Sequence, residues 1–314
     1  MERSHSVHKV QTALHNAVVT IGNFDGVHIG HREIISKVVQ KAKELGGVSV
    51  VVTFHPHPRK VLFPEAELKN IFPVEDQMKQ FEDMGVDVWI QEPFSRDLSQ
   101  LSAETFLRDW ILKPLSAKAL IVGYDFAFGA NRAGSLTTLE QLSKTYSLDL
   151  EIVKPVKVQD RIVSSTEIRK AIQQGESELV HQMLGRSFFV TGIVEKGDQR
   201  GRGLGFPTAN VATAFETLPL QGVYATQTLI RGVLYDSVTN VGRKPTFEKQ
   251  DNTLKIESHI LNFNQDIYGE EISIFFKERL RDEIKFKSVQ DLIEQIKSDV
   301  ETAKKVLERN GDIK

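Results

Sequence analysis

The sequence predicts a parallel α/β sheet of the doubly wound type, followed by a smaller antiparallel β-barrel or sandwich that ends in a helix. Three observations support this prediction. Strand-like and helix-like segments alternate through the first half, which is typical of a parallel sheet covered by helices. Short alternating strands separated by Gly, Asn and Asp turns fill the second half. The length of 314 residues suits two domains.

The first half begins with a β-branched run at 17–22, followed by a helical pattern over 31–47. The apolar face of that helix is predicted to carry Ile34, Ile35, Val38, Ala42 and Leu45. Residues 48–54 are continuously apolar, as expected of a strand covered on both faces. Helical patterns at 74–87 and 102–115 then alternate with strands at 88–94 and 117–126. Ligands bind beyond the carboxyl ends of such strands. The segments GNFDGVHIGH (22–31) and GYDFAFG (123–129) fall at those ends.

The second half is predicted to contain strands at 188–198, 222–230, 233–242, 254–263 and 271–280, and a closing helix at 288–309. Gly185 ends a helical pattern, and strands follow it. We therefore predict two domains, 1–184 and 185–314.

Composition limits the classes of partner. Lys and Arg total 40 against 42 Asp and Glu, a net charge of −2, which lacks the basic character of most nucleic-acid binders. The absence of cysteine excludes disulfides and thiolate metal sites and is consistent with a reducing compartment. No run approaches the roughly 18 apolar residues of a membrane span, and no secretory leader is evident. We expect a soluble cytoplasmic protein with small-molecule partners, and leave a homo-oligomer open.

The tetrapeptide His28-Ile29-Gly30-His31 is the first chemical motif. Its two imidazoles are neighbours on one helical turn, and Gly30 lets an anion approach the backbone. A helix start also offers unpaired N–H groups, so the turn can stabilise charge at a reacting phosphate. An ordinary polar helix start, or half of a metal site with His55 and His57, remains an alternative reading.

A second motif lies at 161–172, RIVSSTEIRKAI. Ser164 and Glu167 fit a capping box that opens a helix with an apolar face of Ile168, Ala171 and Ile172. The first turn of that helix places hydroxyls and a fixed positive charge where phosphate oxygens could bind. The residues concerned are Ser165, Thr166 and Arg169. A well-capped surface helix is the alternative.

The second half contains GDQRGRGLGFPTAN at 197–210, which matches neither a Walker A loop nor a dinucleotide fingerprint. Gly201, Gly203 and Gly205 make a positive glycine-rich loop that could fold over phosphates. Thr208 and Asn210 share one face of an extended chain and carry the hard oxygen donors that suit Mg²⁺. Two polar side chains that face solvent would give the same pattern.

Glu257 stands in a predicted strand, where a carboxylate could be a general base for a hydroxyl group. Simple exposure of this side chain is the alternative.

The first two motifs together resemble the nucleotidyltransferase superfamily, whose members pair H-x-G-H with an (I/V)SST-x-x-R motif. The resemblance implies that His28, His31 and Arg169 stabilise charge while an α-phosphate is attacked and pyrophosphate leaves. It also implies that nucleotide is bound by Gly22, Asn23, Phe24, Asp25, Gly30, Gly123, Asp125, Ser164, Ser165 and Thr166. The class I aminoacyl-tRNA synthetases share the literal HIGH, but no K-M-S-K-S-like segment is present.

Five segments of the second half resemble the riboflavin kinase module: 197–210, GVYA (222–225), NVGRKPTF (240–247), 256–269 and RLRDEIKF (279–286). The resemblance implies a six-stranded barrel in which Thr208 and Asn210 bind Mg²⁺ with ATP and Glu257 is the base. By the same match, Gly201, Gly203 and Gly205 contact nucleotide, and Arg281 and Glu283 border the flavin.

Together, the two halves resemble the bacterial bifunctional riboflavin kinase/FAD synthetase family. That resemblance implies a transferase that uses ATP, Mg²⁺ and the flavins riboflavin, FMN and FAD. Two rival functions remain: a nicotinamide or cytidylyl type of nucleotidyltransferase, and a flavin-binding regulator without catalysis.

Overall fold

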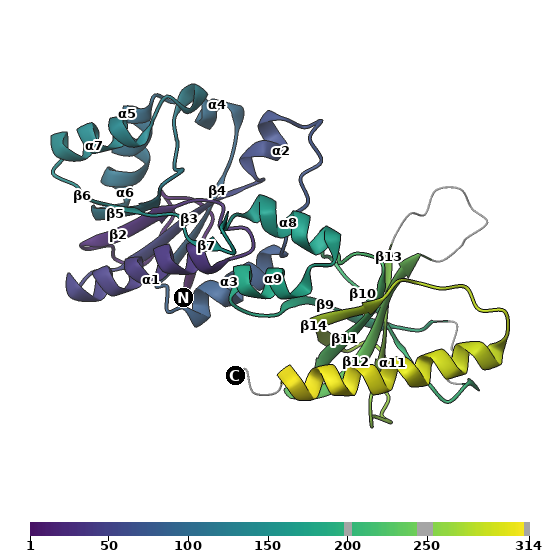
Figure 1. Ribbon diagram of the computed structural model, residues 1–314. Coiled ribbons are helices and arrows are strands. Elements are labelled where there is room, and N and C mark those ends of the chain that lie inside the picture. The colour runs from purple at the N-terminus through teal and green to yellow at the C-terminus, as the bar shows by residue number, and fades with distance from the viewer. Residues whose placement is uncertain (198–202, 244–253, 311–314) are drawn as a thin grey trace. The chain divides into compact units, whose positions relative to one another are not determined.

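The computed structural model describes residues 1–197, 203–243 and 254–310. The chain divides into two compact units, Met1–Ser165 and Thr166–Lys314, and each is described by itself (Figure 1).

The first unit is built on a six-stranded sheet in which every neighbouring pair is parallel. Its strand order is β1-β4-β3-β2-β5-β6. The strands are β1 (Glu2–Ser4), β2 (Ala17–Ile21), β3 (Ser49–His55), β4 (Val88–Pro93), β5 (Ala117–Gly123) and β6 (Asp149–Val153). The parallel α/β sheet is therefore confirmed.

Successive side chains of each strand point to opposite faces of the sheet. Since the strands are apolar on both faces, helices cover both of them. Val19, Val50 and Leu120 pack in one core, with helical side chains between 106 and 139. Val18, Val51 and Trp89 pack in the other core, with α1. The longer helices are α1 (Ile29–Glu44), α3 (Val74–Asp83) and α7 (Leu136–Thr145); the shorter ones are α2 (Pro58–Leu62) and α4 (Arg96–Ser99). A hairpin of β7 (Lys157–Val158) and β8 (Arg161–Ile162) precedes the end of the unit.

The prediction for the apolar face of α1 is wrong at one residue, Leu45. Ile34, Ile35, Val38 and Ala42 are buried as expected, but Leu45 is 39% exposed. Leu45 is the residue that ends α1, and its N–H bonds back to Lys41 and Lys43. It therefore lies beyond the last turn that faces the sheet.

The segment at 102–115 is helical but not one regular helix. It consists of α5 (Ala103–Thr105), a π-helix η1 (Phe106–Leu112) and α6 (Lys113–Leu115). The Lys113 N–H donates to the carbonyl of Arg108, five residues back, which is the π pattern. Pro114 has no N–H with which to resume α-helical bonding at this point.

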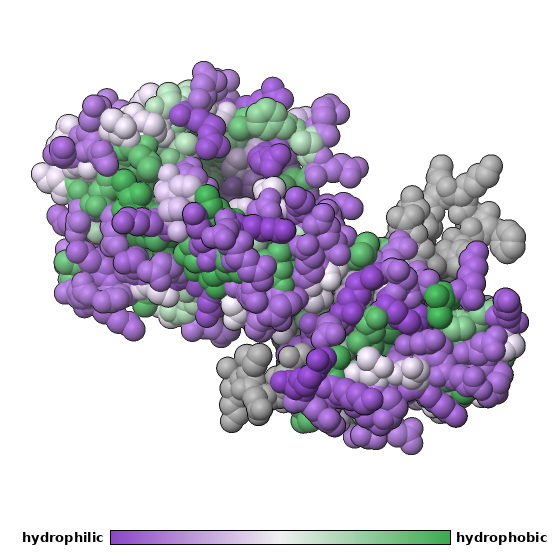
Figure 2. Space-filling model, in the orientation of Figure 1, coloured by the Kyte–Doolittle hydropathy of each residue, from purple (hydrophilic) through white to green (hydrophobic). Residues whose placement is uncertain are grey.

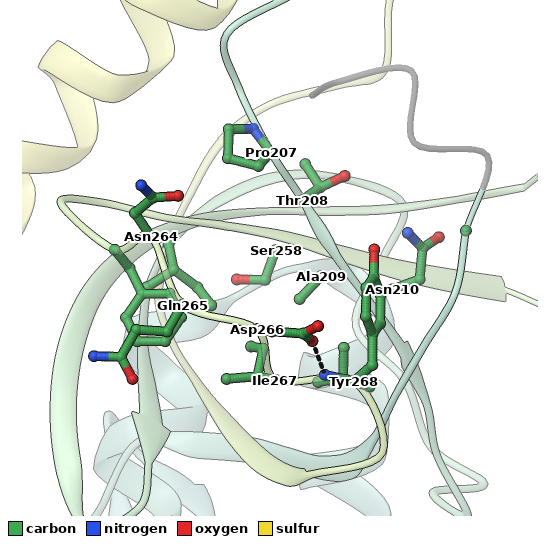
Figure 3. Close-up of a pocket in the computed structure, with 14 residues that line it drawn as sticks. Pro207, Thr208, Ala209, Asn210, Ser258, Asn264, Gln265, Asp266, Ile267 and Tyr268 are labelled. Carbon is green, nitrogen blue, oxygen red and sulfur yellow. Dashed lines mark hydrogen bonds between the residues drawn. The ribbon is translucent and has the colours of Figure 1, made fainter. Parts of the chain in front are cut away.

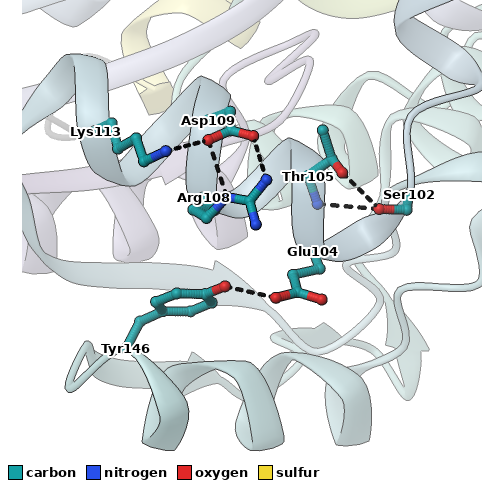
Figure 4. A network of polar contacts seen from close by, with 7 residues as sticks. All are labelled: Ser102, Glu104, Thr105, Arg108, Asp109, Lys113 and Tyr146. Atoms are coloured by element: carbon teal, nitrogen blue, oxygen red, sulfur yellow. Dashed lines mark hydrogen bonds and ion pairs between the residues drawn. The ribbon is translucent and has the colours of Figure 1, made fainter.

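Polar contacts fix the outer side of this segment (Figure 4). The Asp109 carboxylate accepts hydrogen bonds from Arg108 Nε at 2.9 Å and from Lys113 Nζ at 2.7 Å. These two cations hold the pKa of Asp109 well below its usual range. Tyr146, which follows α7, donates to Glu104 at 2.6 Å and so ties α5 to the next helix.

The second unit is a closed antiparallel barrel with strand order β10-β13-β12-β11-β14-β9, so the barrel alternative is confirmed. Its strands are β9 (Phe188–Glu195), β10 (Ala209–Ala212), β11 (Gly222–Ile230), β12 (Val233–Arg243), β13 (Leu254–Ile260) and β14 (Glu271–Arg281). The helices are α8 (Ser165–Gln174) and α9 (Ser177–Leu184) before it, and α11 (Val289–Asn310) after it. α11 packs on the outside of the barrel, with Ala303, Val306 and Leu307 against Val223, Ala225 and Val238.

Inside the barrel, five fully buried hydroxyl groups form a closed ring of hydrogen bonds. The ring runs Ser258–Thr239–Thr226–Ser237–Thr228 and returns to Ser258, with oxygen separations of 2.7–3.3 Å. Each oxygen has two hydroxyl partners, so burial of these polar groups leaves none unsatisfied.

Candidate active sites

The turn between β2 and α1 has unusual backbone conformations. Phe24, Gly26 and Val27 all have positive φ, at 50°, 88° and 39°. A β-branched residue such as Val27 rarely adopts this region, and such strain persists only where surrounding contacts hold it. The buried carboxylate of Asp25 supplies them: Oδ1 accepts the N–H of Ile71 at 2.9 Å and that of Phe72 at 3.5 Å. Asp25 thus binds a neighbouring loop, and its contact with nucleotide stays a prediction.

His28 and His31 lie together at the start of α1, as the i, i+3 spacing predicts. Their rings stack, with centroids 3.5 Å apart and planes 20° apart. His28 is the N-cap residue, and its Nδ1 accepts the His31 N–H at 3.2 Å. A neutral His28 therefore carries its proton on Nε2. A Cβ at Gly30 would lie 3.3 Å from the His28 ring, so glycine leaves room for this ring.

The second motif meets the first through Ser165. Its hydroxyl donates to the carbonyl of Asp25 at 2.7 Å, across 140 residues of sequence. Ser164 immediately precedes α8, the position that the capping pattern predicts. The predicted apolar face of α8 is confirmed, because Ile168, Ala171 and Ile172 are all buried.

Two further residues of this motif, Thr166 and Arg169, belong to the second unit. Their approach to the histidines therefore stays a prediction.

Asn23 offers an acceptor beside this turn. Its backbone carbonyl accepts the amide of Gln77 at 2.7 Å, whereas its buried side-chain oxygen has no hydrogen-bond partner among the described residues. Buried polar atoms are nearly always paired, so an orphaned amide oxygen points to a donor on a bound molecule. Gly22, just before it, would bring a Cβ to 3.0 Å from the Phe24 ring.

The segment after β5 brings aromatic rings to the same carboxyl end of the sheet. Phe126 and Phe128 stack with centroids 5.3 Å apart, and Phe106 of η1 lies 5.9 Å from Phe128. Sequence reasoning singled out Gly123 and Asp125 here, and a Cβ at Gly123 would lie 3.1 Å from the Asp125 carboxylate. Phe106 and Phe128 are buried in the core of the first unit and Phe126 packs against that core, so these rings hold the segment in place.

The barrel contains a pocket of about 400 Å³ beside the PTAN segment (Figure 3). Thr208 and Asn210 line it, and a loop that includes Asn264 and Asp266 faces them. A Cβ at Gly197 would lie 2.2 Å from the Asn210 amide nitrogen, so a larger residue there would displace the Asn210 side chain from its position at the pocket. One hydroxyl and one amide oxygen on the same pocket wall suit a Mg²⁺ ion that takes its other ligands from water and phosphate.

Strand register places Glu257 next to this wall. Glu257 of β13 pairs with Asn210 of β10 on one side and with Asn240 of β12 on the other. All three are half-buried and alternate with inward residues, so they form one row on the outer face of the barrel. Sequence reasoning missed Asn240, which only the register of β12 brings into the row.

The predicted flavin residues lie at the far end of this row. Glu283 Oε1 accepts the Asn240 amide at 3.3 Å, and a Cβ at Gly242 would come 2.0 Å from that oxygen. Arg281 donates through Nε and Nη2 to both oxygens of Asp299 in α11, at 2.9 and 2.6 Å. Arg281 is therefore held in place by α11, and its contact with flavin stays a prediction.

The glycine-rich loop is described in part. Gly205 has a φ of +87°, which favours glycine, whereas a Cβ at Gly203 would meet nothing within 4 Å. Gly201 lies outside the described residues. Across the described part of the chain, no helix has both the length and the apolar character needed to cross a membrane.

Comparison with known proteins identifies a family for each half of the chain. A family model for FAD synthetase matches residues 10–167, and one for riboflavin kinase matches residues 184–307. The bifunctional riboflavin kinase/FMN adenylyltransferases of Bacillus subtilis and Escherichia coli K12 are 37% and 32% identical to this chain. Those alignments cover 96% of this chain and 95% of the Bacillus protein, and 94% of both chains for Escherichia coli.

Among solved structures, a macrolide-efflux protein from Streptococcus pneumoniae has a TM-score of 0.88 at 30% identity. The match covers 96% of this chain and 98% of that one. The resemblance seen in the sequence is thereby confirmed: the chain belongs to the bifunctional riboflavin kinase/FMN adenylyltransferase family.

Proposed function

We propose that this chain makes FAD in two ATP-dependent steps. The barrel transfers the terminal phosphate of ATP to riboflavin and gives FMN. The parallel-sheet unit then joins FMN to the AMP portion of a second ATP, and pyrophosphate leaves. Use of ATP and flavins follows from the family; the assignment of residues is our proposal.

The observation that carries the proposal is the register of the barrel. It sets a carboxylate, Glu257, directly beside Asn210, which lines the pocket. A general base must lie within reach of the hydroxyl that attacks the phosphate, and the phosphate must be held at the same time. Because β10 pairs with β13, the proposed base lies next to a residue that could hold the phosphate through Mg²⁺.

In the kinase step, Glu257 accepts the proton of the ribityl hydroxyl as that oxygen attacks the terminal phosphorus of ATP, the bond from this phosphorus to the bridging oxygen breaks, and ADP leaves. Thr208 and Asn210 would hold Mg²⁺, which neutralises phosphate charge when bound. Glu283, fixed by Asn240, and Arg281, fixed by Asp299, border the flavin.

In the adenylyl step, an oxygen of the FMN phosphate attacks the α-phosphorus of ATP, and the bond to the pyrophosphate oxygen breaks. His28, His31 and Arg169 stabilise the added negative charge, and the N–H groups that open α1 add a partial positive charge. Ser164, Ser165 and Thr166 bind phosphate oxygens. The attacking phosphate is already an anion near neutral pH, so no residue has to remove a proton.

Residues 1–184 and 185–314 are our proposed functional domains, since the riboflavin kinase match begins at 184 and the first strand of the barrel at Phe188. We place the enzyme in the cytoplasm because it consumes ATP twice. Its relatives from Bacillus subtilis and Escherichia coli are named for the same two activities.

Product analysis tests the proposal. The full chain is incubated with riboflavin, ATP and Mg²⁺, and flavins are separated by chromatography. We expect FMN and FAD from the unchanged protein. Glu257→Gln should make no FMN yet convert supplied FMN to FAD. A His28→Ala/His31→Ala double variant should stop at FMN. Glu278→Gln and His15→Ala, at exposed positions, serve as matched controls.

Other outcomes would favour the rival functions. Tight flavin binding without turnover of ATP would indicate a regulator. Adenylylation of nicotinamide mononucleotide in preference to FMN would indicate another nucleotidyltransferase. Formation of both FMN and FAD in the presence of EDTA would exclude the Mg²⁺ assignment and leave the two proposed activities standing.

A further inference from the structure

The hairpin between β11 and β12 has an unusual residue at its tip. Ile230 and Val233 are its last paired residues, so Arg231 and Gly232 form a two-residue turn. Both have positive φ, 50° and 79°, which defines a type I′ turn. The first position of such a turn favours Asn, Asp or Gly, and an arginine there carries backbone strain. Strain of this kind is retained where the side chain has a task.

The guanidinium of Arg231 spans a second loop, residues 262–270 between β13 and β14. Arg231 Nε donates to Glu270 Oε2 at 2.9 Å, and Nη2 pairs with the other oxygen of that carboxylate. Arg231 Nη1 donates to Gln265 Oε1 at 2.9 Å, and Nη2 also reaches the carbonyl of Asp266 at 3.5 Å. One side chain thus contacts three residues of the loop.

This loop forms a wall of the pocket that Thr208 and Asn210 also line (Figure 3). Its two ends are held from elsewhere: the Phe263 ring packs on Tyr235 at 5.0 Å, and the Gly269 N–H donates to Val194 at 2.8 Å. Between these ends, Asp266 Oδ1 accepts the Tyr268 N–H at 3.0 Å. Asp266 is contacted by Arg231 and Tyr268 lines the pocket, so this hydrogen bond links Arg231 to the pocket wall.

We propose that Arg231 is a positioning residue for the nucleoside triphosphate of the kinase reaction. It holds the loop at 262–270 in the conformation that receives the nucleotide, without touching the nucleotide itself. The inference rests on the proposed kinase function of this pocket. The Arg231 side chain is 55% exposed, and an ion pair so exposed adds little to stability. We therefore expect Arg231 to act by keeping the loop ordered. Without Arg231, nucleotide binding would have to order the loop, and the entropy lost in doing so would weaken binding.

The turn itself supplies a sharp test, because Arg231→Asn installs a residue that a type I′ turn prefers. We expect thermal stability to be unchanged or raised, while the KM for ATP in FMN formation rises about three- to tenfold. The kcat, the KM for riboflavin and the adenylylation of supplied FMN should stay constant. Glu270→Gln, which removes the partner charge, should raise the KM for ATP in the same direction. Arg309→Asn, which breaks an exposed pair with Glu278, is the control.

Amide hydrogen exchange provides a second readout that needs no turnover. Exchange in residues 262–270 should be faster in Arg231→Asn than in the unchanged protein, with no change in β11 or β12. An unchanged KM for ATP in an active kinase would overturn the proposal. The proposal would also be overturned if kcat and thermal stability fell while the KM values for ATP and riboflavin both rose, because such a pattern indicates general damage. If the unchanged protein makes no FMN, it is the kinase function that fails. The positioning role is then tested by exchange alone, and equal exchange of residues 262–270 in Arg231→Asn and in the unchanged protein would overturn it.

Discussion

Asp25, which the sequence resemblance assigns to nucleotide binding, has a structural contact in the fold. Its carboxylate accepts two buried backbone N–H groups from Ile71 and Phe72, and its own carbonyl accepts the Ser165 hydroxyl. These contacts surround the strained residues Phe24 and Val27. Asp25 therefore shapes the turn that presents the histidines.

The first residue-scale prediction concerns this carboxylate. Asp25→Ala leaves the amides of Ile71 and Phe72 without their acceptor, which should cost about 1–3 kcal/mol of unfolding free energy. FAD formation from FMN should fall while riboflavin phosphorylation is retained. Urea unfolding measured by tryptophan fluorescence tests the stability change. Asp25→Asn keeps one acceptor oxygen and should lose less; an equal loss in both variants would contradict this explanation.

A pH dependence is expected from Tyr224, which is 1% exposed inside the barrel and donates to the carbonyl of Leu220. Burial raises the pKa of Tyr224 to about 12, and the nearby Arg279 offsets part of this effect. A raised folded-state pKa means that the stabilisation is complete below pH 10 and is lost as pH rises towards 12.

The unfolding free energy should therefore fall by roughly 1.4 kcal/mol per pH unit above 10 from this group. Urea titrations followed by circular dichroism at pH 9–11 measure the slope. The slope should be smaller in Tyr224→Phe, which cannot ionise, and equal slopes would show that Tyr224 titrates without effect.

At the scale of elements, the closing helix does more than cover apolar strands. Asp299 of α11 is buried and binds Arg281 of β14 through two hydrogen bonds, and Gln295 adds a third to the same carboxylate at 2.8 Å. This contact sets the direction of the Arg281 side chain beside Glu283. The closing helix thus orders one border of the proposed flavin site.

Removing this carboxylate should be costly because it leaves a half-buried guanidinium without its counter-charge. We expect Asp299→Ala to lower the unfolding free energy by about 3–5 kcal/mol and to raise the KM for riboflavin. Lys304→Ala breaks the exposed pair with Glu301 on the same helix and should change stability by less than about 0.5 kcal/mol. Steady-state kinetics with a urea titration separates the two effects; an unchanged KM would remove Arg281 from the flavin border.

At the scale of the whole molecule, the two units have separate hydrophobic cores, so we expect their unfolding to be separable. Both tryptophans of the chain, Trp89 and Trp110, lie in the first unit. Tryptophan fluorescence therefore reports that unit alone, whereas circular dichroism reports both. Chains with several domains commonly depart from two-state unfolding.

Asp299→Ala should accordingly leave the tryptophan transition where it is and move only part of the circular dichroism transition to lower urea. Asp25→Ala should move the whole tryptophan transition and only part of the circular dichroism transition to lower urea. A shift of the tryptophan transition in Asp299→Ala, or a shift of the entire circular dichroism transition in either variant, would show that the units unfold as one cooperative body.

Much of the fold was predictable because its elements have strong local patterns. The apolar runs of β2, β3 and β5 and the alternation in β11 and β13 were recognised within a few residues. β1 was not recognised, since Glu2, Arg3 and Ser4 have no strand pattern and pair only because β4 lies beside them. The π-helix at 106–112 was likewise read as an ordinary helix, because its apolar spacing is compatible with both.

The sequence by itself determined the family, the order of the two units and the motifs, since these depend on residue types at short spacings. Only the tertiary structure decided which distant side chains meet. Ser165 reaches Asp25, Asn240 joins Glu257, and Arg231 spans the loop at 262–270. The physical reason is that register and side-chain contacts between segments far apart in the chain arise from packing, to which no local pattern is sensitive.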